Sequence, residues 1–244
     1  MDVLVPFSAD QPKSRLSRVL SPAERSSFAR AMLRDVLEAV AAAGGDPTVL
    51  ANAPIGTGVA DTDPDSGVDV ATDTDLSADI DAEVSVIVDE RPLTPAVNAA
   101  LKAWFADGAA APIAVVMADL ALATPQSLRE LFAAGDDTAL AIAPGRGGGT
   151  NALVVSTPSF HVDYHGASYL DHRRIAREIG ASVSVVDSHR LATDVDEPGD
   201  LAELLIHRDA SSHASCRSAA WLADAGFQLD TTAGRVGIER TDQS

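Results

Sequence analysis

Residues 112–120 read PIAVVMADL, and this stretch indicates the fold class most directly. Its apolar residues follow one another without the alternation of a half-exposed strand, which is typical of parallel sheets that are covered on both faces. Residues 3–7, 48–52 and 84–88 are similar short apolar runs, and helical patterns separate them. Strands that alternate with helices predict a three-layer α/β/α domain with right-handed crossovers.

Three predicted helices begin with a hydroxyl residue followed by proline: Ser21-Pro22, Thr94-Pro95 and Thr124-Pro125. The hydroxyl can accept a hydrogen bond from a free N–H of the first turn. Proline lacks an N–H, but at the first helical position that group would have no partner within the helix. The first helix ends at Gly44-Gly45. Later predicted elements are strands at 139–143, 152–155 and 182–186, helices at 168–179, 198–206 and 211–225, and a hairpin over 227–239.

The 244 residues fit one domain with an extension better than two domains. We expect the domain to span residues 1–210, and residues 211–244 to form a C-terminal extension packed on it. Residues 53–82 are rich in Asp, Thr, Gly and Pro and nearly free of large apolar side chains. This stretch is predicted to be an acidic surface excursion.

The charge balance excludes several classes of partner. The 36 acidic residues outnumber the 18 Lys and Arg, the formal net charge is −18, and the only lysines are Lys13 and Lys102. Such a chain repels nucleic acid polymers and anionic membranes. Abundant acid combined with small residues is typical of proteins adapted to concentrated salt, where the Debye length falls to about 3 Å at 1 M. We therefore expect a halophilic protein.

The single cysteine, Cys216, excludes a disulfide framework. The N-terminus shows no signal-peptide pattern, and the longest apolar run is far shorter than the roughly 18 residues of a membrane span. We expect a cytoplasmic protein that is neither exported nor embedded in a membrane.

Lys13 and Arg15 lie in the loop after the first predicted strand, within SADQPKSRLS at residues 8–17. Ligands of open α/β sheets bind at the carboxyl ends of strands. An ammonium and a guanidinium there suit phosphate oxygens, although two solvated cations on a surface loop are the alternative. The loop is neither a P-loop nor a Rossmann fingerprint.

Asp119 ends the predicted strand of residues 112–118, at a position where a carboxylate can bind a hard cation such as Mg²⁺. Residues 193–201, TDVDEPGDL, add alternating carboxylates before a predicted helix. Asp194 and Asp196 fall on one side of an extended segment, so either could join Asp119 as a second ligand. Asp200 would complement the helix dipole. A turn or capping role is the alternative for Asp119.

Residues 143–153, APGRGGGTNAL, form the most specific motif. Four glycines in five positions give a backbone that can approach a ligand closely and direct successive N–H groups at an anion. Arg146, Thr150 and Asn151 add side-chain donors. A flexible hairpin is the alternative.

Five stretches together resemble the 2-phospho-L-lactate guanylyltransferases of coenzyme F-420 biosynthesis, in a haloarchaeal form. They are PKSRLS at 12–17, MADL at 117–120, the glycine-rich motif, Ser168 with His172, and DVDEPGDL at 194–201. The match runs from about residue 1 to residue 206. The glycine-rich motif is the discriminating one. PKSRLS, MADL and DVDEPGDL are shared more loosely with sugar-nucleotide and molybdopterin nucleotidyltransferases.

The resemblance implies a nucleotide-diphospho-sugar-transferase-like fold with a mixed, mostly parallel sheet, and a homodimer. It implies that Lys13 and Arg15 hold the GTP phosphates together with Arg146. It also implies that Asp119 and Asp196 bind Mg²⁺. Lys13, Arg15 and Asp119 are then the catalytic residues.

The acceptor would be bound by Thr150, Gly166 and Ser168, as the resemblance implies. Two departures from the family pattern fall near this group. His165 stands within Tyr164-His165-Gly166, where a Tyr-Gly pair is expected, and Thr94 stands where the family commonly has Asn.

The reaction implied is attack of a phosphate oxygen of 2-phospho-L-lactate on the α-phosphorus of GTP. Pyrophosphate leaves, and the product is lactyl-2-diphospho-5'-guanosine. One alternative is the same chemistry with phosphoenolpyruvate or 3-phosphoglycerate as acceptor. Another is a non-catalytic nucleotide-binding module in which the aspartates are surface acids.

Overall fold

A computed structural model describes residues 1–10, 12–55, 69–72, 84–106, 111–207, 216–232, 234 and 236–241, and at 69–72 it describes the backbone alone. Most of the acidic excursion predicted for residues 53–82 lies outside the described residues. So do residues 211–215 of the last predicted helix.

Within the described ranges, eight strands form one mixed sheet in the order β3-β4-β2-β1-β5-β7-β6-β8. Six of them run parallel, whereas β7 lies antiparallel between β5 and β6, and β3 is an antiparallel edge strand. The mixed, mostly parallel sheet is therefore confirmed. The strands are β1 (Asp2–Phe7), β2 (Asp46–Ala51), β3 (Asp69–Thr72), β4 (Ser85–Val88), β5 (Ile113–Val116), β6 (Leu140–Pro144), β7 (Thr150–Val155) and β8 (Val183–Val185).

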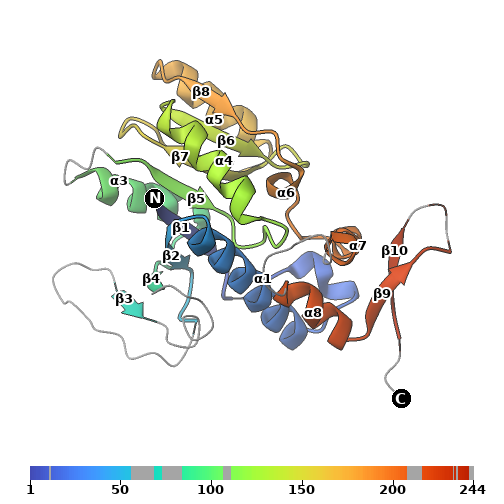
Figure 1. Ribbon diagram of the computed structural model, residues 1–244. Helices are drawn as coiled ribbons and strands as arrows, with labels where there is room; N and C mark the ends of the chain where they lie inside the picture. The colour runs from blue at the N-terminus through green and yellow to red at the C-terminus, as the bar shows by residue number, and fades with distance from the viewer. Residues whose placement is uncertain are drawn as a thin grey trace.

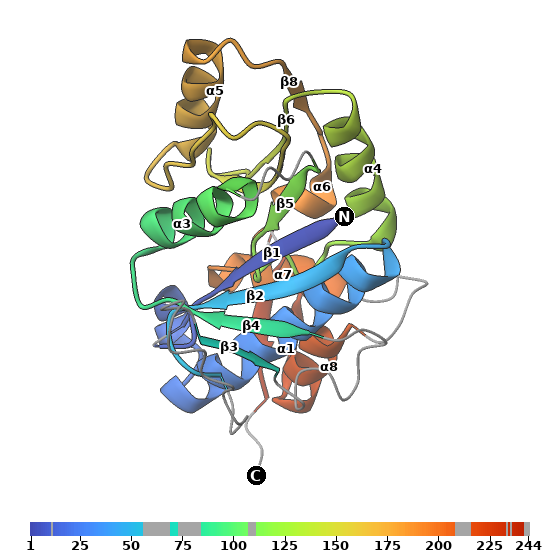
Figure 2. The same ribbon diagram turned by 90° about the vertical axis from the view of Figure 1, so that its left-hand side faces the viewer.

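Helices cover both faces of the sheet, which confirms the three layers (Figures 1 and 2). One face carries α1 (Pro22–Ala42), α4 (Pro125–Asp136), α7 (Pro198–His207) and α8 (Arg217–Asp224), and the other carries α3 (Leu93–Ala106) and α5 (Ser168–Glu178). The short helices η1 (Ser14–Arg18) and α6 (His189–Ala192) follow β1 and β8, and β9 (Phe227–Asp230) with β10 (Gly237–Arg240) forms the predicted hairpin.

Strand β5 shows why PIAVVMADL indicated the fold. Ala114 and Val116 pack into the core under α1 and α4, whereas Ile113 and Val115 pack into the core under α3 and α5. Successive side chains of a strand point to opposite faces, so a strand covered on both faces is apolar throughout. The chain then leaves the sheet at its carboxyl edge and reaches Asp119.

Two of the three predicted helix caps are confirmed. Ser21 and Thr124 both form capping boxes, each with proline in the first turn. Thr94 is not a cap, because α3 already begins at Leu93 and the amide of Ala96 donates to the carbonyl of Pro92. The Thr94 hydroxyl accepts a hydrogen bond from the amide of Tyr164 instead, at 2.8 Å.

Helix α8 packs on α1. The rings of Phe28 and Trp221 lie 5.2 Å apart, and Asp35 accepts hydrogen bonds from the amides of Arg217 and Ser218 at the start of α8. Burial raises the pKa of the Cys216 thiol to about 11, and this side chain contacts Asp35. A protonated, half-buried thiol fits a structural role for Cys216. Within the described residues, no helix has the length and apolarity needed to cross a bilayer.

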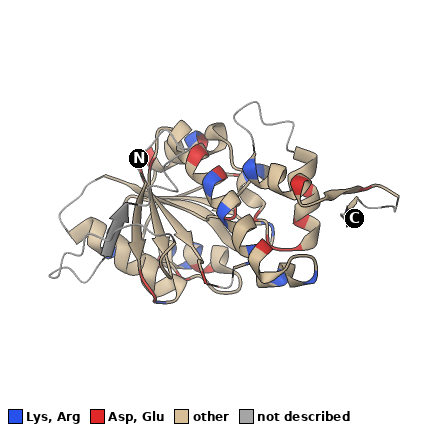
Figure 3. Cartoon of the chain, turned by 90° about the horizontal axis from the view of Figure 1, so that it is seen from below, with Lys and Arg blue, Asp and Glu red and all other residues tan. Residues whose placement is uncertain are grey.

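In the described part of the chain, charged residues lie mainly on the helices and at strand ends (Figure 3). With a net charge of −18, mutual repulsion of carboxylates opposes the compact state. Salt shortens the Debye length from about 10 Å at 0.1 M to about 3 Å at 1 M. We therefore expect the melting temperature to rise when KCl is increased from about 0.1 M to about 2 M. An unchanged melting temperature across this range would contradict the halophilic interpretation.

Candidate active site

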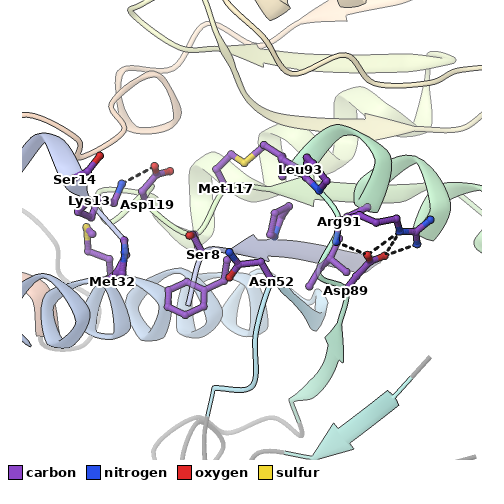
Figure 4. A pocket seen from close by; sticks show the side chains of 18 of the residues that line it. Ser8, Lys13, Ser14, Met32, Asn52, Asp89, Arg91, Leu93, Met117 and Asp119 are labelled. Atoms are coloured by element: carbon purple, nitrogen blue, oxygen red, sulfur yellow. Dashed lines mark hydrogen bonds and ion pairs between the residues drawn. The ribbon is translucent and has the colours of Figure 1, made fainter. Parts of the chain in front are cut away.

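A cavity of about 550 Å³ opens at the carboxyl edge of the sheet. Its lining includes Phe7 at the end of β1, Asn52 after β2, Asp89 after β4 and Met117 after β5 (Figure 4). Lys13, Asp119 and Asp196 also line it. The predicted phosphate loop and the predicted metal ligands therefore meet in one place.

Lys13 lies between two carboxylates. Its Nζ is 2.8 Å from Asp119 Oδ2 and 2.6 Å from Asp196 Oδ1, and only 10% of the side chain is exposed. Lys13 is also the only non-glycine residue in the described part of the chain with positive φ, at 55°. Such a backbone conformation costs on the order of 1 kcal/mol and is concentrated at functional sites.

The two carboxylates determine the charge state of Lys13. Burial by itself would lower the pKa of the ammonium, but Asp119 and Asp196 raise it above its ordinary value. Lys13 is therefore a fixed positive charge at neutral pH. Arg15 adds a second cation, since its guanidinium lies 3.2 Å from Asp196 Oδ2 and is mostly exposed to solvent.

Asp194 completes a carboxylate cluster with Asp119 and Asp196, and one oxygen of each lies within 4.8 Å of the others. Asp119 Oδ1 is buried and has no hydrogen-bond partner among the described residues. Burial, followed by the charge of Asp119, raises the pKa of Asp194. A buried unpaired oxygen among crowded carboxylates fits a hard divalent cation, which prefers oxygen ligands.

Asn151 connects this cluster to the glycine-rich loop. Its side-chain amide donates to Asp194 Oδ1 at 3.2 Å and to the carbonyl of Leu191 at 3.0 Å. A Cβ at Gly145 would come within 2.4 Å of Asn151 Oδ1, so only glycine fits there. The glycine allows Asn151 to pack beneath the loop and hold Asp194.

The loop itself corrects one expectation. The amide of Gly145 donates to Gly149, that of Gly148 donates to Gly145, and that of Arg146 donates to Ala192. These three N–H groups are therefore not available to a ligand, because they donate hydrogen bonds within the tight turn and to α6. The Arg146 guanidinium pairs with Asp200 at 2.8 Å, and Arg146 does not line the cavity.

Asp200 lies in the first turn of α7, as expected for a carboxylate that complements the helix dipole. Asp200 Oδ2 accepts hydrogen bonds from the amides of Asp196 and Glu197, at 3.1 and 2.8 Å. It caps the start of α7 and fixes the backbone that carries Asp196. Through Asp200, Arg146 supports this candidate metal ligand.

The predicted acceptor group lies beyond Asn151 and outside the lining of the cavity. Ser168 Oγ accepts a hydrogen bond from the amide of Thr150 at 2.9 Å. Thr150 Oγ1 lies 2.8 Å from His172 Nδ1, and the amide of Asp163 donates to His172 Nε2 at 2.9 Å. Gly166 follows in the same segment with φ 51°.

His172 determines how these hydroxyls can be used. Burial lowers the pKa of its imidazole to about 4, so the ring is neutral at physiological pH. Because Nε2 accepts the Asp163 amide, the ring proton is on Nδ1 and is donated to Thr150 Oγ1. The oxygens of Thr150 and Ser168 thus each receive a hydrogen bond. Within the described residues neither hydroxyl proton has an acceptor, which leaves two O–H donors for an anion.

The two departures from the family pattern border this group. Thr94 holds the amide of Tyr164, and His165 Nδ1 lies 2.7 Å from Asp163 Oδ1. His165 is exposed, and it extends toward Asp163 rather than toward Thr150 or Ser168. Both residues therefore support the segment of Gly166.

Asn52 and Asp89 are cavity residues that the sequence analysis did not single out. Asn52 Oδ1 accepts hydrogen bonds from the amides of Ala9 and Asp10, at 2.8 and 3.3 Å. The Asn52 NH₂ group is therefore the end available to the cavity. Arg91 lowers the pKa of Asp89 by hydrogen bonding to its carboxylate. Asn52 ends one predicted strand and Asp89 directly follows another, so the rule that pointed to Lys13 and Asp119 could have found them.

The chain is similar to known proteins over nearly its whole length. A family model described as "Guanylyl transferase CofC like" matches residues 1–235. The 2-phospho-L-lactate guanylyltransferase of Halorubrum lacusprofundi is 60% identical over 98% of this chain and 100% of its own length. That of Natrialba magadii is 54% identical over 98% and 99%, and that of Methanoregula boonei is 40% identical over 98% and 95%.

Among solved structures, a protein of Desulfovibrio desulfuricans classed with the nucleotide-diphospho-sugar transferases matches with a TM-score of 0.69. The match covers 91% of this chain and 94% of that one at 16% identity, which supports the fold alone. The family model extends to residue 235, so the similarity does not end near residue 206 as expected from the motifs. Helix α8 and strand β9 fall inside it.

Proposed function

The chain belongs to the CofC-like guanylyl transferase family, and from this premise we propose that it transfers the guanylyl group of GTP to 2-phospho-L-lactate. The products are lactyl-2-diphospho-5'-guanosine and pyrophosphate. The observation that carries the proposal is the ammonium of Lys13 between Asp119 and Asp196 at the edge of the cavity. The names of the relatives favour this acceptor over phosphoenolpyruvate and 3-phosphoglycerate.

Asp119 and Asp196, with Asp194 beside them, would hold Mg²⁺, which supplies positive charge to phosphate oxygens when it is bound. Lys13 and Arg15 are proposed to bind the phosphates of GTP. A divalent cation on the carboxylates would replace the ammonium as their counter-charge and leave Lys13 Nζ available to phosphate. The protein's main contribution is to position two anions and stabilise charge on the leaving pyrophosphate.

Thr150 and Ser168 are proposed to bind the acceptor through the two O–H donors described above. Gly166 is proposed to line the same side of the acceptor site. Charged acceptors strengthen such hydrogen bonds. Asn151 links this group to Asp194, so the acceptor would lie next to the carboxylate cluster. Arg146 is proposed to act through Asp200 and to add positive charge near the nucleotide.

Guanine is proposed to occupy the end of the cavity that holds Asn52 and Asp89, opposite Lys13 and Asp119 (Figure 4). The Asn52 NH₂ group would donate to the carbonyl oxygen O6, where adenine carries an amino group instead. A carboxylate such as Asp89 can accept from N1–H and the 2-amino group. Together these groups would select guanine.

Replacing Asn52 by aspartate tests the base assignment. The aspartate can still accept the amides of Ala9 and Asp10, but it presents an oxygen to O6 instead of a donor. We expect kcat/KM for GTP to fall about 100-fold, since O6 of guanine loses its hydrogen-bond donor. The ratio of kcat/KM for ATP to kcat/KM for GTP should rise. An equal fall for both nucleotides would contradict a role in reading the base.

Acidification tests the neutral state of His172. The folded pKa is about 4 and the ordinary value is 6.5, so the unfolded chain binds this proton first as the pH falls. The stabilisation is complete above pH 6.5 and is lost toward pH 4, by about 3 kcal/mol in total. Asparagine at this position keeps a donor for Thr150 but does not titrate. Urea unfolding should therefore show a shallower pH dependence in His172→Asn, and parallel profiles would contradict the assignment.

The function is tested by incubating the protein with GTP, Mg²⁺ and each of the three candidate acids in molar KCl. With 2-phospho-L-lactate, mass spectrometry should detect lactyl-2-diphospho-5'-guanosine as the main product. A conjugate formed mainly with phosphoenolpyruvate or 3-phosphoglycerate would change the acceptor. No conjugate with any acid would contradict the function.

A homodimer is proposed from the family resemblance. Light scattering at high salt should then give twice the 25.2 kDa of one chain. A single-chain mass at enzyme-assay concentrations would contradict it.

A further inference from the structure

A second group of metal-binding side chains lies on α6 and α7, outside the lining of the cavity. His189 begins α6, and Glu203 and His207 lie one turn apart on α7. His189 Nε2 is 3.8 Å from Glu203 Oε2, and His207 Nε2 is 3.5 Å from the same oxygen. One ligand atom of each residue lies within 4.8 Å of the other two.

These separations are longer than good hydrogen bonds, which are 2.7–3.2 Å for an N–H donor and an oxygen acceptor. They come close to the edge of about 3.3 Å that a tetrahedron has when its metal–ligand bonds are about 2.0–2.1 Å, as for zinc. In the part of the chain that the structure describes, neither imidazole nitrogen forms a hydrogen bond with Glu203. A small inward movement of the side chains would bring all three onto one ion.

The donor set distinguishes this group from the catalytic carboxylates. Two imidazoles and one carboxylate suit zinc and similar transition metals, whereas Mg²⁺ prefers oxygen alone. The side chains are 51%, 32% and 29% exposed, so an ion can enter and water can fill its remaining positions.

The position of the group gives it a consequence for the active site. Residues 193–197 join α6 to α7 and carry both Asp194 and Asp196. Helix α6 also receives the side chain of Asn151 and the amide of Arg146, through the carbonyls of Leu191 and Ala192. An ion shared by α6 and α7 would therefore fix both ends of the segment that presents the catalytic carboxylates.

We propose that His189, Glu203 and His207 bind a divalent transition-metal ion of the zinc class, which ties α6 to α7 behind the catalytic segment. The site goes beyond the proposed reaction and needs neither GTP nor an acceptor. The expected binding is one ion per chain.

Co²⁺ is the probe for the site, because its visible absorption reports nitrogen ligation and low coordination number. Untagged protein, freed of metal by a chelator, is titrated in about 2 M KCl with excess Mg²⁺, so that oxygen-only sites are screened or filled. We expect one equivalent of Co²⁺ to give an intense band that Zn²⁺ abolishes. His189→Gln and His207→Gln should each weaken binding at least about tenfold, whereas the exposed control His161→Gln should not.

Thermal unfolding gives a second readout. Zn²⁺ should raise the melting temperature of the native protein and of Asp119→Asn, but not of His207→Gln, because only a folded-state site adds stability. Asp119→Asn also separates this site from the proposed function, since it removes the catalytic carboxylate and keeps the histidines. The proposal is overturned if the Co²⁺ band is the same in His189→Gln, or if Zn²⁺ leaves the native melting temperature unchanged.

Discussion

Asp119→Asn is expected to reduce pyrophosphate release about 1,000-fold while the protein remains folded, as for loss of a group that stabilises developing charge. Asp119 Oδ2 contacts Lys13, and Oδ1 is buried without a hydrogen-bond partner in the part of the chain that the structure describes. Asparagine keeps the shape of the side chain but removes the charge that a divalent cation requires. The measurement is release of pyrophosphate from GTP in the presence of 2-phospho-L-lactate.

The matched control is Asp136→Asn, which removes one exposed carboxylate at the end of α4. Both variants change the net charge equally, so a general effect of charge on this acidic protein would appear in both. Circular dichroism at high salt confirms folding. Release by Asp119→Asn within a few-fold of the control would contradict the assignment of Asp119 as a cation ligand.

Lys13→Met is expected to lower kcat/KM for GTP about 100-fold or more, because a charged donor to phosphate is lost. At the same time the variant should bind Mg²⁺ more tightly in the absence of nucleotide. In the native protein the ammonium is the counter-charge of Asp119 and Asp196, and methionine leaves both carboxylates to the cation. These two opposite effects are specific to the geometry seen here.

Lys102→Met is the control, because Lys102 is the only other lysine and is exposed on α3. Methionine also retains a Cβ, so the backbone strain at Lys13 is the same before and after the change. Turnover is measured by pyrophosphate release and Mg²⁺ affinity by calorimetry. Equal losses in the two variants, or weaker Mg²⁺ binding in Lys13→Met, would contradict the role of Lys13.

Much of the site could be predicted because strand ends in a parallel sheet meet at one edge. That rule, applied to local patterns, placed Lys13 and Asp119 together although they are separated by more than 100 residues. The period of two along an extended segment likewise placed Asp194 and Asp196 on one side. In each case a local sequence pattern identifies the residues, and the sheet topology brings them together.

The parts that the sequence did not reveal depend on tertiary contacts. Thr94-Pro95 has the same local pattern as the confirmed cap at Thr124, yet the amide of Tyr164 uses the Thr94 hydroxyl. The neutral state of His172 follows from its burial and from the amide of Asp163, neither of which any spacing shows. The turn at Gly145 uses its own amides, so four glycines alone do not make an anion site.

The net charge of −18 and the few cations act on different scales. The first concerns the whole surface and its screening by salt, whereas the second concerns a cavity in which Lys13 has two carboxylate partners. A strongly acidic protein can therefore bind two small anions when a divalent cation and local donors offset the repulsion.

The most direct measurement is ³¹P nuclear magnetic resonance of the protein with GTP, Mg²⁺ and 2-phospho-L-lactate at high salt. We expect free pyrophosphate together with two coupled phosphorus signals, one from the phosphate of phospholactate and one from the α-phosphate of GTP. Both signals of the coupled pair should be absent with Asp119→Asn. Formation of GMP and pyrophosphate without the coupled pair, or of GDP and phosphate, would contradict guanylyl transfer to this acceptor.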